Sequence, residues 1–134
     1  MNVDPRLHHH SQQIVPGTLE DVMEMYKHLG CEVVYRPAGD MKWAMVGQGQ
    51  LRFAIQIVEY SDAPIQDIEI KRRTHVAFIS DDPQGLLNAI KQWAGSKNIQ
   101  FREGGWSETE RYFDLPGIFI NFVIEVMHSS IEEE

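Results

Sequence analysis

The chain has 134 residues, of which 43% are hydrophobic and 24% are charged, as is typical of one globular domain. Its formal net charge of −8 disfavours binding to the phosphate backbone of nucleic acids, and no apolar stretch reaches the roughly 20 residues of a membrane-spanning helix. A single cysteine, Cys31, excludes an intrachain disulfide, and the first residues lack a secretory signal pattern, so we expect a cytoplasmic protein without nucleic-acid or membrane partners.

The first half of the chain predicts one strand, one helix and three further strands. Residues 7–15 fit a strand, and "TLEDVMEMYKHLG" follows as a helix with Thr18 as its N-cap, acidic residues in its first turn and Gly30 at its end. Three strand-like runs come next, "CEVVYR", "MKWAMVG" and "LRFAIQIVEY", separated by turn residues. The order of elements over residues 7–60 is therefore βαβββ.

The second half repeats this order after a linker at residues 61–71. "RRTHVAFIS" fits a strand, "DDPQGLLNAIKQWAGSKN" a helix, and "IQFREG", "ERYFDL" and "IFINFVIEV" three strands. The apolar spacing of the first helix recurs in the second helix with a shift of 64 residues. One such module has too little apolar surface to fold alone, so we predict a single α+β domain, residues 1–134. Its modules at 7–60 and 72–127 share a core, and residues 128–134 form an acidic tail.

Three polar side chains interrupt strands that are otherwise apolar. Gln56 lies inside "LRFAIQIVEY", and Glu125 is the only charge in "IFINFVIEV". His75 starts the strand "RRTHVAFIS" on the face away from the predicted helix. A buried polar group without a partner costs about 1–3 kcal/mol, so these residues need a partner or a ligand. Ordinary hydrogen bonds, or an arginine beside Glu125, would also account for them.

The three consecutive histidines supply a fourth candidate position at the start of the first strand. Alternation puts His8 and His10 on one face of the strand and His9 on the other. The helix shift matches Ser11 to His75, whereas a one-residue difference in the loop before the helix matches His10 to His75. One imidazole from each first strand, with the amide and the carboxylate, would form a mixed N and O ligand set suited to Mn, Co, Ni, Fe or Zn.

The sequence resembles the vicinal oxygen chelate superfamily, which includes glyoxalase I, extradiol dioxygenases, methylmalonyl-CoA epimerase and the bleomycin-resistance proteins. The resemblance covers residues 7–127 and depends on "HHHSQQIV", "TLEDVMEMYKHLG", "IQIVEYSDAPI", "THVAFISDD" and "RYFDLPGIFINFVIEVM". It implies paired βαβββ modules that curl as mixed sheets around a cleft, with metal ligands in the first and fourth strand of each module.

Carried over to this chain, the resemblance implies one divalent metal ion (Zn, Ni, Co, Mn or Fe) and a ligand set most similar to that of the epimerases. The implied ligands are His10, Gln56, His75 and Glu125. If the last strand is registered from the turn at Gly117, Asn121 takes the position of Glu125. In this family the metal binds two adjacent substrate oxygens and stabilises an enediolate while a base moves a proton, a role that Glu125 would also fill.

Two functions follow from the resemblance. The first is a metal-dependent lyase, isomerase or epimerase of the glyoxalase type, acting on a small substrate with adjacent oxygens. The second is a metal-free protein of the bleomycin-resistance type that sequesters a cationic drug. In either case Asn121, Trp43 and Trp106 are candidate substrate-binding residues, although packing in the core would also explain the aromatic rings. We also predict a homodimer, because half-barrel modules leave edges that pair readily.

Overall fold

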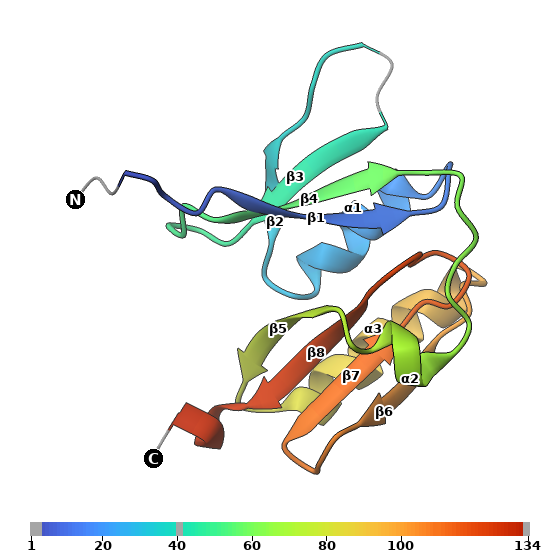
Figure 1. Cartoon of the computed structure of the whole chain (residues 1–134). Coiled ribbons are helices and arrows are strands. Elements are labelled where there is room, and N and C mark those ends of the chain that lie inside the picture. Colours follow the sequence, from blue (N-terminus) through green and yellow to red (C-terminus); the bar gives the residue numbers. More distant parts are fainter. Residues whose placement is uncertain (1–3, 40–41, 133–134) are drawn as a thin grey trace.

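The chain folds into two separate four-stranded mixed sheets, which confirms the predicted α+β fold of two βαβββ modules (Figure 1). The computed structural model describes residues 4–39 and 42–132. Sheet A has the strand order β1-β4-β3-β2, and sheet B has the order β5-β8-β7-β6. In each sheet the first and last strands of the module are parallel neighbours, with the first strand at the edge of the sheet, and the other neighbours are antiparallel.

The elements of the two modules follow in the same order along the chain. Sheet A and its helix comprise β1 (His9–Ile14), α1 (Leu19–Lys27), β2 (Glu32–Tyr35), β3 (Trp43–Gly47) and β4 (Ala54–Glu59). Sheet B and its helices comprise α2 (Ile68–Lys71), β5 (His75–Ser80), α3 (Pro83–Ser96), β6 (Arg102–Gly105), β7 (Glu110–Asp114), β8 (Val123–His128) and the 3₁₀ turn η1 (Ser129–Glu132).

Two segments outside the predicted modules carry structure of their own. The linker at residues 61–71 contains helix α2, which the sequence pattern does not predict. The predicted tail begins with His128, which is the last residue of β8, and continues as η1. Glu133 and Glu134, the end of that tail, lie outside the described residues.

The start of α1 is capped by a different residue from the one predicted. Thr18 occupies the N-cap position, but its hydroxyl donates to the carbonyl of Val15 at 2.6 Å and makes no cap. Glu59 of β4 takes this role, because its Oε2 accepts hydrogen bonds from the backbone N–H of Gly17 at 2.9 Å and of Leu19 at 3.1 Å. A carboxylate there also complements the positive end of the helix dipole. The fourth strand of the module therefore fixes the helix.

Side chains that point from the sheets toward the helices form one core shared by both modules. Strand alternation places an apolar residue at every second position on these inner faces. Buried examples from sheet A, sheet B and the two long helices are Ile14, Val46, Ile57, Phe113, Ile124, Val126, Val22, Tyr26, Leu87 and Ile90. The face of each sheet opposite its helix is left outside this core, and we name these the free faces of sheets A and B.

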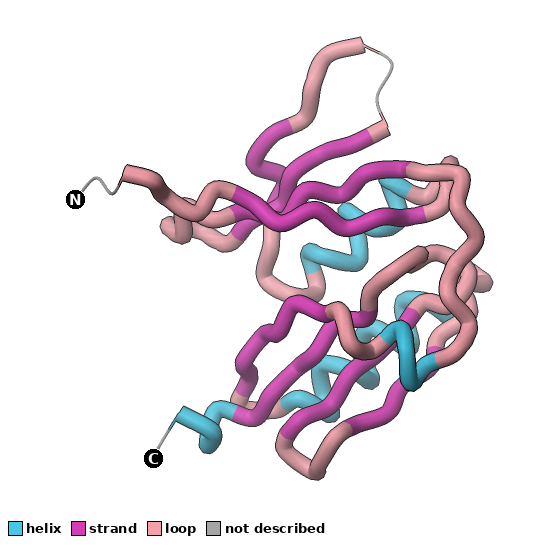
Figure 2. The backbone as a smooth tube through the Cα atoms, viewed as in Figure 1, coloured by secondary structure: helices cyan, strands magenta, loops and turns pink. Residues whose placement is uncertain are grey.

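The loop before β8 joins the two sheets. Ile14 forms an isolated antiparallel bridge with Phe119, and the backbone N–H of Ile120 donates to the carbonyl of Gln13 at 3.0 Å. Figure 2 shows this loop rising from sheet B to reach sheet A. The strands of sheet A overlap in Figure 1 whereas those of sheet B lie side by side, so the two sheets are turned relative to each other. Within the described ranges, no helix is long and apolar enough to span a membrane.

Candidate functional site

The register of the two sheets defines equivalent positions in the two modules. His9 of β1 lies opposite Ala54 of β4, and Gln56 follows two residues later along β4. His75 of β5 lies opposite Val123 of β8, and Glu125 follows two residues later along β8. Because residues two apart on a strand share a face, both pairs lie on the free faces of their sheets. His9 and Gln56 therefore correspond to His75 and Glu125.

The register places His9, and not the predicted His10, on the face of sheet A that carries Gln56. His10 lies opposite Ile55, whose side chain is buried on the inner face of sheet A, so His10 is on the other side of the sheet from Gln56. The error came from the loop between strand and helix. It spans residues 15–18 in the first module and only 81–82 in the second, so matching the helices puts the strands two residues out of step.

His75 and Glu125 contact each other on the free face of sheet B. The distance from His75 Nε2 to Glu125 Oε1 is 3.3 Å. His75 Nδ1 lies 2.9 Å from the carbonyl oxygen of Arg72, and because a carbonyl only accepts, Nδ1 carries the proton in this bond. The lone pair of the neutral ring is then on Nε2, which faces the carboxylate. This arrangement is typical of a histidine that ligates a metal ion through Nε2.

Glu125 is a carboxylate in an apolar strand and is only 6% exposed. Burial raises the pKa of Glu125, the neighbouring His75 lowers it in part, and Glu110 raises it further. Among the described residues, the structure gives this carboxylate no other ion-pair or hydrogen-bond partner than His75. A buried carboxylate with one weak partner is costly, and a cation bound beside it would remove that cost.

Trp106 and Tyr112 form an aromatic wall beside this pair. The ring centroid of Trp106 lies 5.0 Å from that of His75 and 5.2 Å from that of Tyr112. Tyr112 lies opposite Glu125 in the sheet and packs over Gly104, where a Cβ atom would come within 2.4 Å of the tyrosine Oη. A residue with a side chain at position 104 would therefore collide with the Tyr112 ring, and Gly104 avoids this collision. Trp106, predicted to bind substrate, is at the candidate site and 39% exposed.

Asn121 lies at the junction of the modules and not on a free face. It precedes β8, and its Oδ1 accepts a hydrogen bond from the backbone N–H of Gln13 at 3.4 Å. The alternative register from the turn at Gly117 does not occur, because β8 places Glu125 on the free face of sheet B. Asn121 therefore helps to hold sheet A against sheet B.

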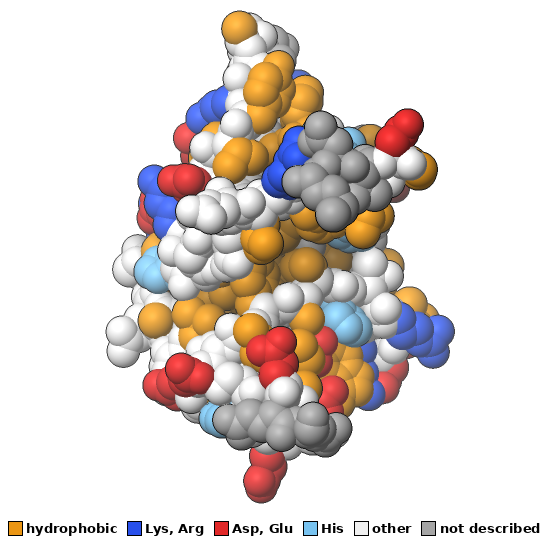
Figure 3. Space-filling model, turned by 90° about the vertical axis from the view of Figure 1, so that its left-hand side faces the viewer, with side chains coloured by type: hydrophobic (Ala, Val, Ile, Leu, Met, Phe, Trp, Pro, Cys, Tyr) orange, Lys and Arg blue, Asp and Glu red, His pale blue; other side chains and the backbone are white. Residues whose placement is uncertain are grey.

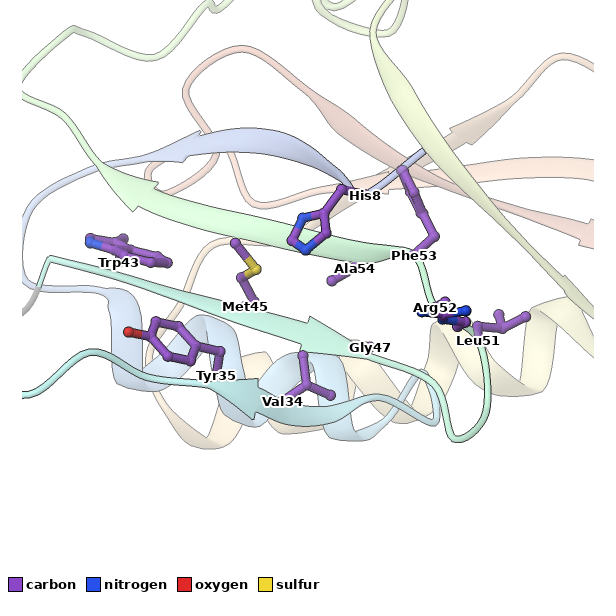
Figure 4. A pocket seen from close by; sticks show the side chains of 10 residues that line it. All are labelled: His8, Val34, Tyr35, Trp43, Met45, Gly47, Leu51, Arg52, Phe53 and Ala54. Carbon is purple, nitrogen blue, oxygen red and sulfur yellow. The ribbon is translucent and has the colours of Figure 1, made fainter. Parts of the chain in front are cut away.

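An open pocket with a volume of about 570 Å³ lies on the free face of sheet A (Figure 4). The described residues that line it are His8, Val34, Tyr35, Trp43, Met45, Gly47, Leu51, Arg52, Phe53 and Ala54. Trp43, the other predicted substrate-binding tryptophan, packs against Tyr35 with ring centroids 5.5 Å apart. The pocket is mostly apolar, and its residue Ala54 precedes Gln56 on the same face of β4. Sequence patterns missed it because its walls come from three strands and two loops.

A second, smaller cavity of about 100 Å³ lies between the modules, on the core side. Val46 and Ile55 of sheet A face Val76 and Phe78 of β5 across it, and Cys31 contributes to its wall. Figure 3 shows hydrophobic side chains along this boundary on one face of the molecule. Burial raises the pKa of the Cys31 thiol to about 11, so it stays protonated at neutral pH and packs as an apolar side chain.

The four candidate ligands do not meet within the chain. In residues 4–39 and 42–132, no three His, Cys, Asp or Glu side chains are close enough together to hold one metal ion. The structure therefore brings His75 and Glu125 together but leaves both His9 and His10 away from them. The physical reason is that the modules share a core on their helix sides, while their free faces point outward in different directions.

Comparison with known proteins identifies the fold. No protein-family model and no curated protein matches the chain. Among solved structures, fosfomycin resistance protein FosX from Listeria monocytogenes, complexed with Mn(II) and sulfate, is 15% identical over 98% of this chain and 95% of that chain, with a TM-score of 0.57. The trypanothione-dependent glyoxalase I of Leishmania major is 16% identical over 96% and 89%, with a TM-score of 0.59.

An antibiotic binding protein from Streptomyces sp. CB03234 has the same fold, with 13% identity over 96% of this chain and 98% of that chain and a TM-score of 0.54. The chain therefore has the fold that FosX and glyoxalase I share, which is the fold that the sequence resemblance implies. Because proteins on this fold include both enzymes and binding proteins, the fold alone does not choose between the two functions.

Proposed function

We propose that the protein is a metal-dependent enzyme of the glyoxalase type, a lyase, isomerase or epimerase acting on a small substrate with two adjacent oxygens. The observation that carries this proposal is the His75–Glu125 pair, in which Nε2 lies 3.3 Å from the carboxylate while the Arg72 carbonyl holds Nδ1. Imidazole and carboxylate ligands suit Zn, Ni, Co, Mn or Fe. The Mn(II) complex of FosX, on the same fold, favours Mn as the first ion to test.

The donor set fits such an ion in its chemistry as well as its geometry. Glu125 is a buried carboxylate whose one ion-pair partner among the described residues is His75, and a divalent ion would supply further positive charge. His75 is already oriented by its Arg72 partner, so little rotational freedom is lost when the ion binds. These two residues make half of a site.

His9 and Gln56 are the residues proposed for the other half. They take the equivalent positions on the free face of sheet A, which points away from His75 and Glu125 of the same chain. In a homodimer, the free face of sheet A in one copy would cover the free face of sheet B in the other. Each dimer would then contain two complete sites related by its twofold axis.

Glu125 is the residue proposed to move the proton. A divalent ion bound at the site would stabilise the negative charge that develops on the two adjacent substrate oxygens. A carboxylate oxygen of Glu125 would take the proton from the carbon beside those oxygens as the C–H bond breaks, and would return it to the same or the neighbouring carbon.

Metal titration tests this proposal. Calorimetry of untagged, metal-free protein with Mn²⁺ and Zn²⁺ should show about one ion per chain, and His75→Ala and Glu125→Gln should each weaken binding at least about tenfold. Lys91→Ala, on the exposed face of α3, is the control and should bind as the wild type does. Full affinity in both His75→Ala and Glu125→Gln would exclude the proposed metal site.

A metal-free binding protein is the alternative function. The 570 Å³ pocket supports it, because a mostly apolar concave site of this volume suits a drug-sized ligand. The antibiotic binding protein on the same fold supports it as well. This function would be favoured if the protein bound a ligand in the pocket and took up no divalent ion. None of the described lining residues is a carboxylate, however, which argues against a cationic drug as the ligand.

A further inference from the structure

We propose that the pocket on the free face of sheet A binds the planar aromatic part of an anionic small molecule. This inference names the substrate class of the proposed enzyme, and it rests on that function only in assigning the bound molecule as substrate. It depends on three observations, which are the shape and volume of the pocket, the aromatic rings at one end and the positive charge at the other.

The volume and the side chains at the centre of the pocket suit a flat apolar group. About 570 Å³ lies within the range of pockets that hold drug-sized molecules. Figure 4 shows Met45 and the His8 ring near the middle, with Ala54 on the strand beside them. Ala54 and Gly47 leave space in the pocket for a ring, because neither has a side chain longer than a methyl group. Met45 adapts to the ring that lies on it, as thioethers do.

One end of the pocket is built for stacking. Tyr35 and Trp43 are tilted against each other by 34° with centroids 5.5 Å apart, and Figure 4 shows both rings at this end. Tyr35 is 53% exposed although it belongs to a strand, so a large part of its ring is free to contact a ligand. Aromatic pairs add about 0.5–1.5 kcal/mol beyond the area that they bury.

The other end carries positive charge that is not neutralised. Arg52 lines the pocket there, and Arg6 is next to it, because its Nη1 donates to the Arg52 carbonyl at 2.9 Å. Within the described part of the chain, neither guanidinium forms an ion pair with a carboxylate. In a protein of net charge −8, an unpaired arginine in the wall of the pocket, with a second arginine bound to its backbone, favours an anionic ligand there.

The pocket also adjoins the proposed ligands on sheet A. His8 lines it and precedes His9, while Ala54 is two residues before Gln56 on the same face of β4. A molecule whose ring fills the pocket would therefore reach the candidate site with its other end. A ring system with an acidic group and a pair of adjacent oxygens meets all of these contacts.

Binding of small aromatic ions to metal-free protein tests the inference. We would titrate 2-naphthoate, its cationic counterpart 2-naphthylmethylammonium and the flexible anion decanoate, using calorimetry. The wild type should bind 2-naphthoate with one molecule per pocket, and both other probes at least about tenfold more weakly. Equal or tighter binding of the cation, or no binding of 2-naphthoate, would overturn the inference.

Two variants locate the binding. Arg52→Gln, at an exposed position that should not affect folding, should weaken binding of 2-naphthoate about tenfold and should not weaken binding of the cationic probe, and Arg73→Gln on the other module is its control. Ala54→Phe should fill the pocket and abolish binding, whereas Ala89→Phe on the exposed side of α3 should not. Unchanged 2-naphthoate binding in both Arg52→Gln and Ala54→Phe would overturn the assignment of the pocket.

Two further measurements answer separate questions. One asks whether a second copy of the chain fills the pocket, and the other asks whether binding in the pocket is independent of metal binding. If Ala54→Phe lowers the mass of the protein in sedimentation while the wild type binds no 2-naphthoate, a second copy fills the pocket and the inference fails. In metal-free protein His75→Ala should keep its affinity for 2-naphthoate although it has lost its metal affinity, since His75 does not line the pocket. A wild-type protein that binds Mn²⁺ but does not bind 2-naphthoate would contradict the pocket assignment and leave the proposed metal site standing.

Discussion

A shift of one residue along β1 decides which histidine faces the candidate site. His9 and His10 are both exposed and adjacent, but strand alternation places only His9 on the face that carries Gln56. The neighbouring His8 contacts His9, because Nδ1 of His8 lies 2.9 Å from Nδ1 of His9. One of these two nitrogens donates to the other, which leaves Nε2 of His9 available for a ligand.

His9→Ala and His10→Ala separate the two histidines by experiment. In calorimetric titrations with Mn²⁺, His9→Ala should lose at least about tenfold in affinity, since a ligand is removed from the proposed set. His10→Ala should bind Mn²⁺ as the wild type does, because its side chain is on the other face of sheet A. A loss confined to His10→Ala would restore the position expected from the sequence.

Glu125 makes the stability of the metal-free protein depend on pH. Because the folded-state pKa is raised, this group stabilises the fold below its unfolded pKa, and that stabilisation is lost as the pH rises through the folded pKa. In urea unfolding with EDTA at pH 8, Glu125→Gln should be more stable than the wild type by about 1 kcal/mol. At a pH near 4 the difference should shrink, since the wild-type carboxyl is then largely protonated. An equal difference at both pH values would contradict this account.

At the scale of elements, the short helix α2 orients the candidate site. Along the chain it lies between β4 of sheet A and β5 of sheet B, and its last residue, Lys71, is only 1% exposed. Lys71 Nζ lies 2.9 Å from Asp114 Oδ1, and Arg102 Nε lies 2.8 Å from Asp114 Oδ2. Burial lowers the pKa of Lys71, and the adjacent Asp114 opposes this shift. This triad fastens α2 to sheet B, and the residue after α2, Arg72, supplies the carbonyl that holds His75.

Removal of the central carboxylate should therefore destabilise the protein strongly. Asp114→Ala leaves the charge of Lys71 buried without a partner, and we expect a loss of about 3–5 kcal/mol in urea unfolding. Glu69→Ala breaks the exposed Arg72–Glu69 pair on the same helix and should cost less than about 1 kcal/mol. A loss in Asp114→Ala as small as in this control would show that the triad does not hold α2.

Sequence patterns predict the long elements but not the connections that set the site. The strands and the helices α1 and α3 follow from apolar periodicity, and the polar residues Gln56, His75 and Glu125 are on the faces expected from alternation. Helix α2 has four residues, too few for a periodic signal. The unequal loops at residues 15–18 and 81–82 carry no pattern that gives their register, so the first histidine was placed wrongly.

At the scale of the whole molecule, the internal repeat is readable from the sequence but the relation of the two modules is not. The contacts that set it are long-range, such as the Ile14–Phe119 bridge and the Trp93 Nε1 donation to Glu24 Oε1 at 2.6 Å. They join the modules on their helix sides and leave the free faces outward. A site that needs both faces must therefore use a second copy of the chain.

Mixing two variants that each lack one proposed metal ligand tests this central claim directly. His9→Ala and His75→Ala would be purified separately, mixed in equal amounts under conditions that exchange subunits, and titrated with Mn²⁺. If each site takes His9 from one copy and His75 from the other, neither variant alone binds Mn²⁺ tightly, and the mixture regains roughly a quarter of the wild-type sites. A mixture that binds no more Mn²⁺ than the separate variants would contradict the shared site.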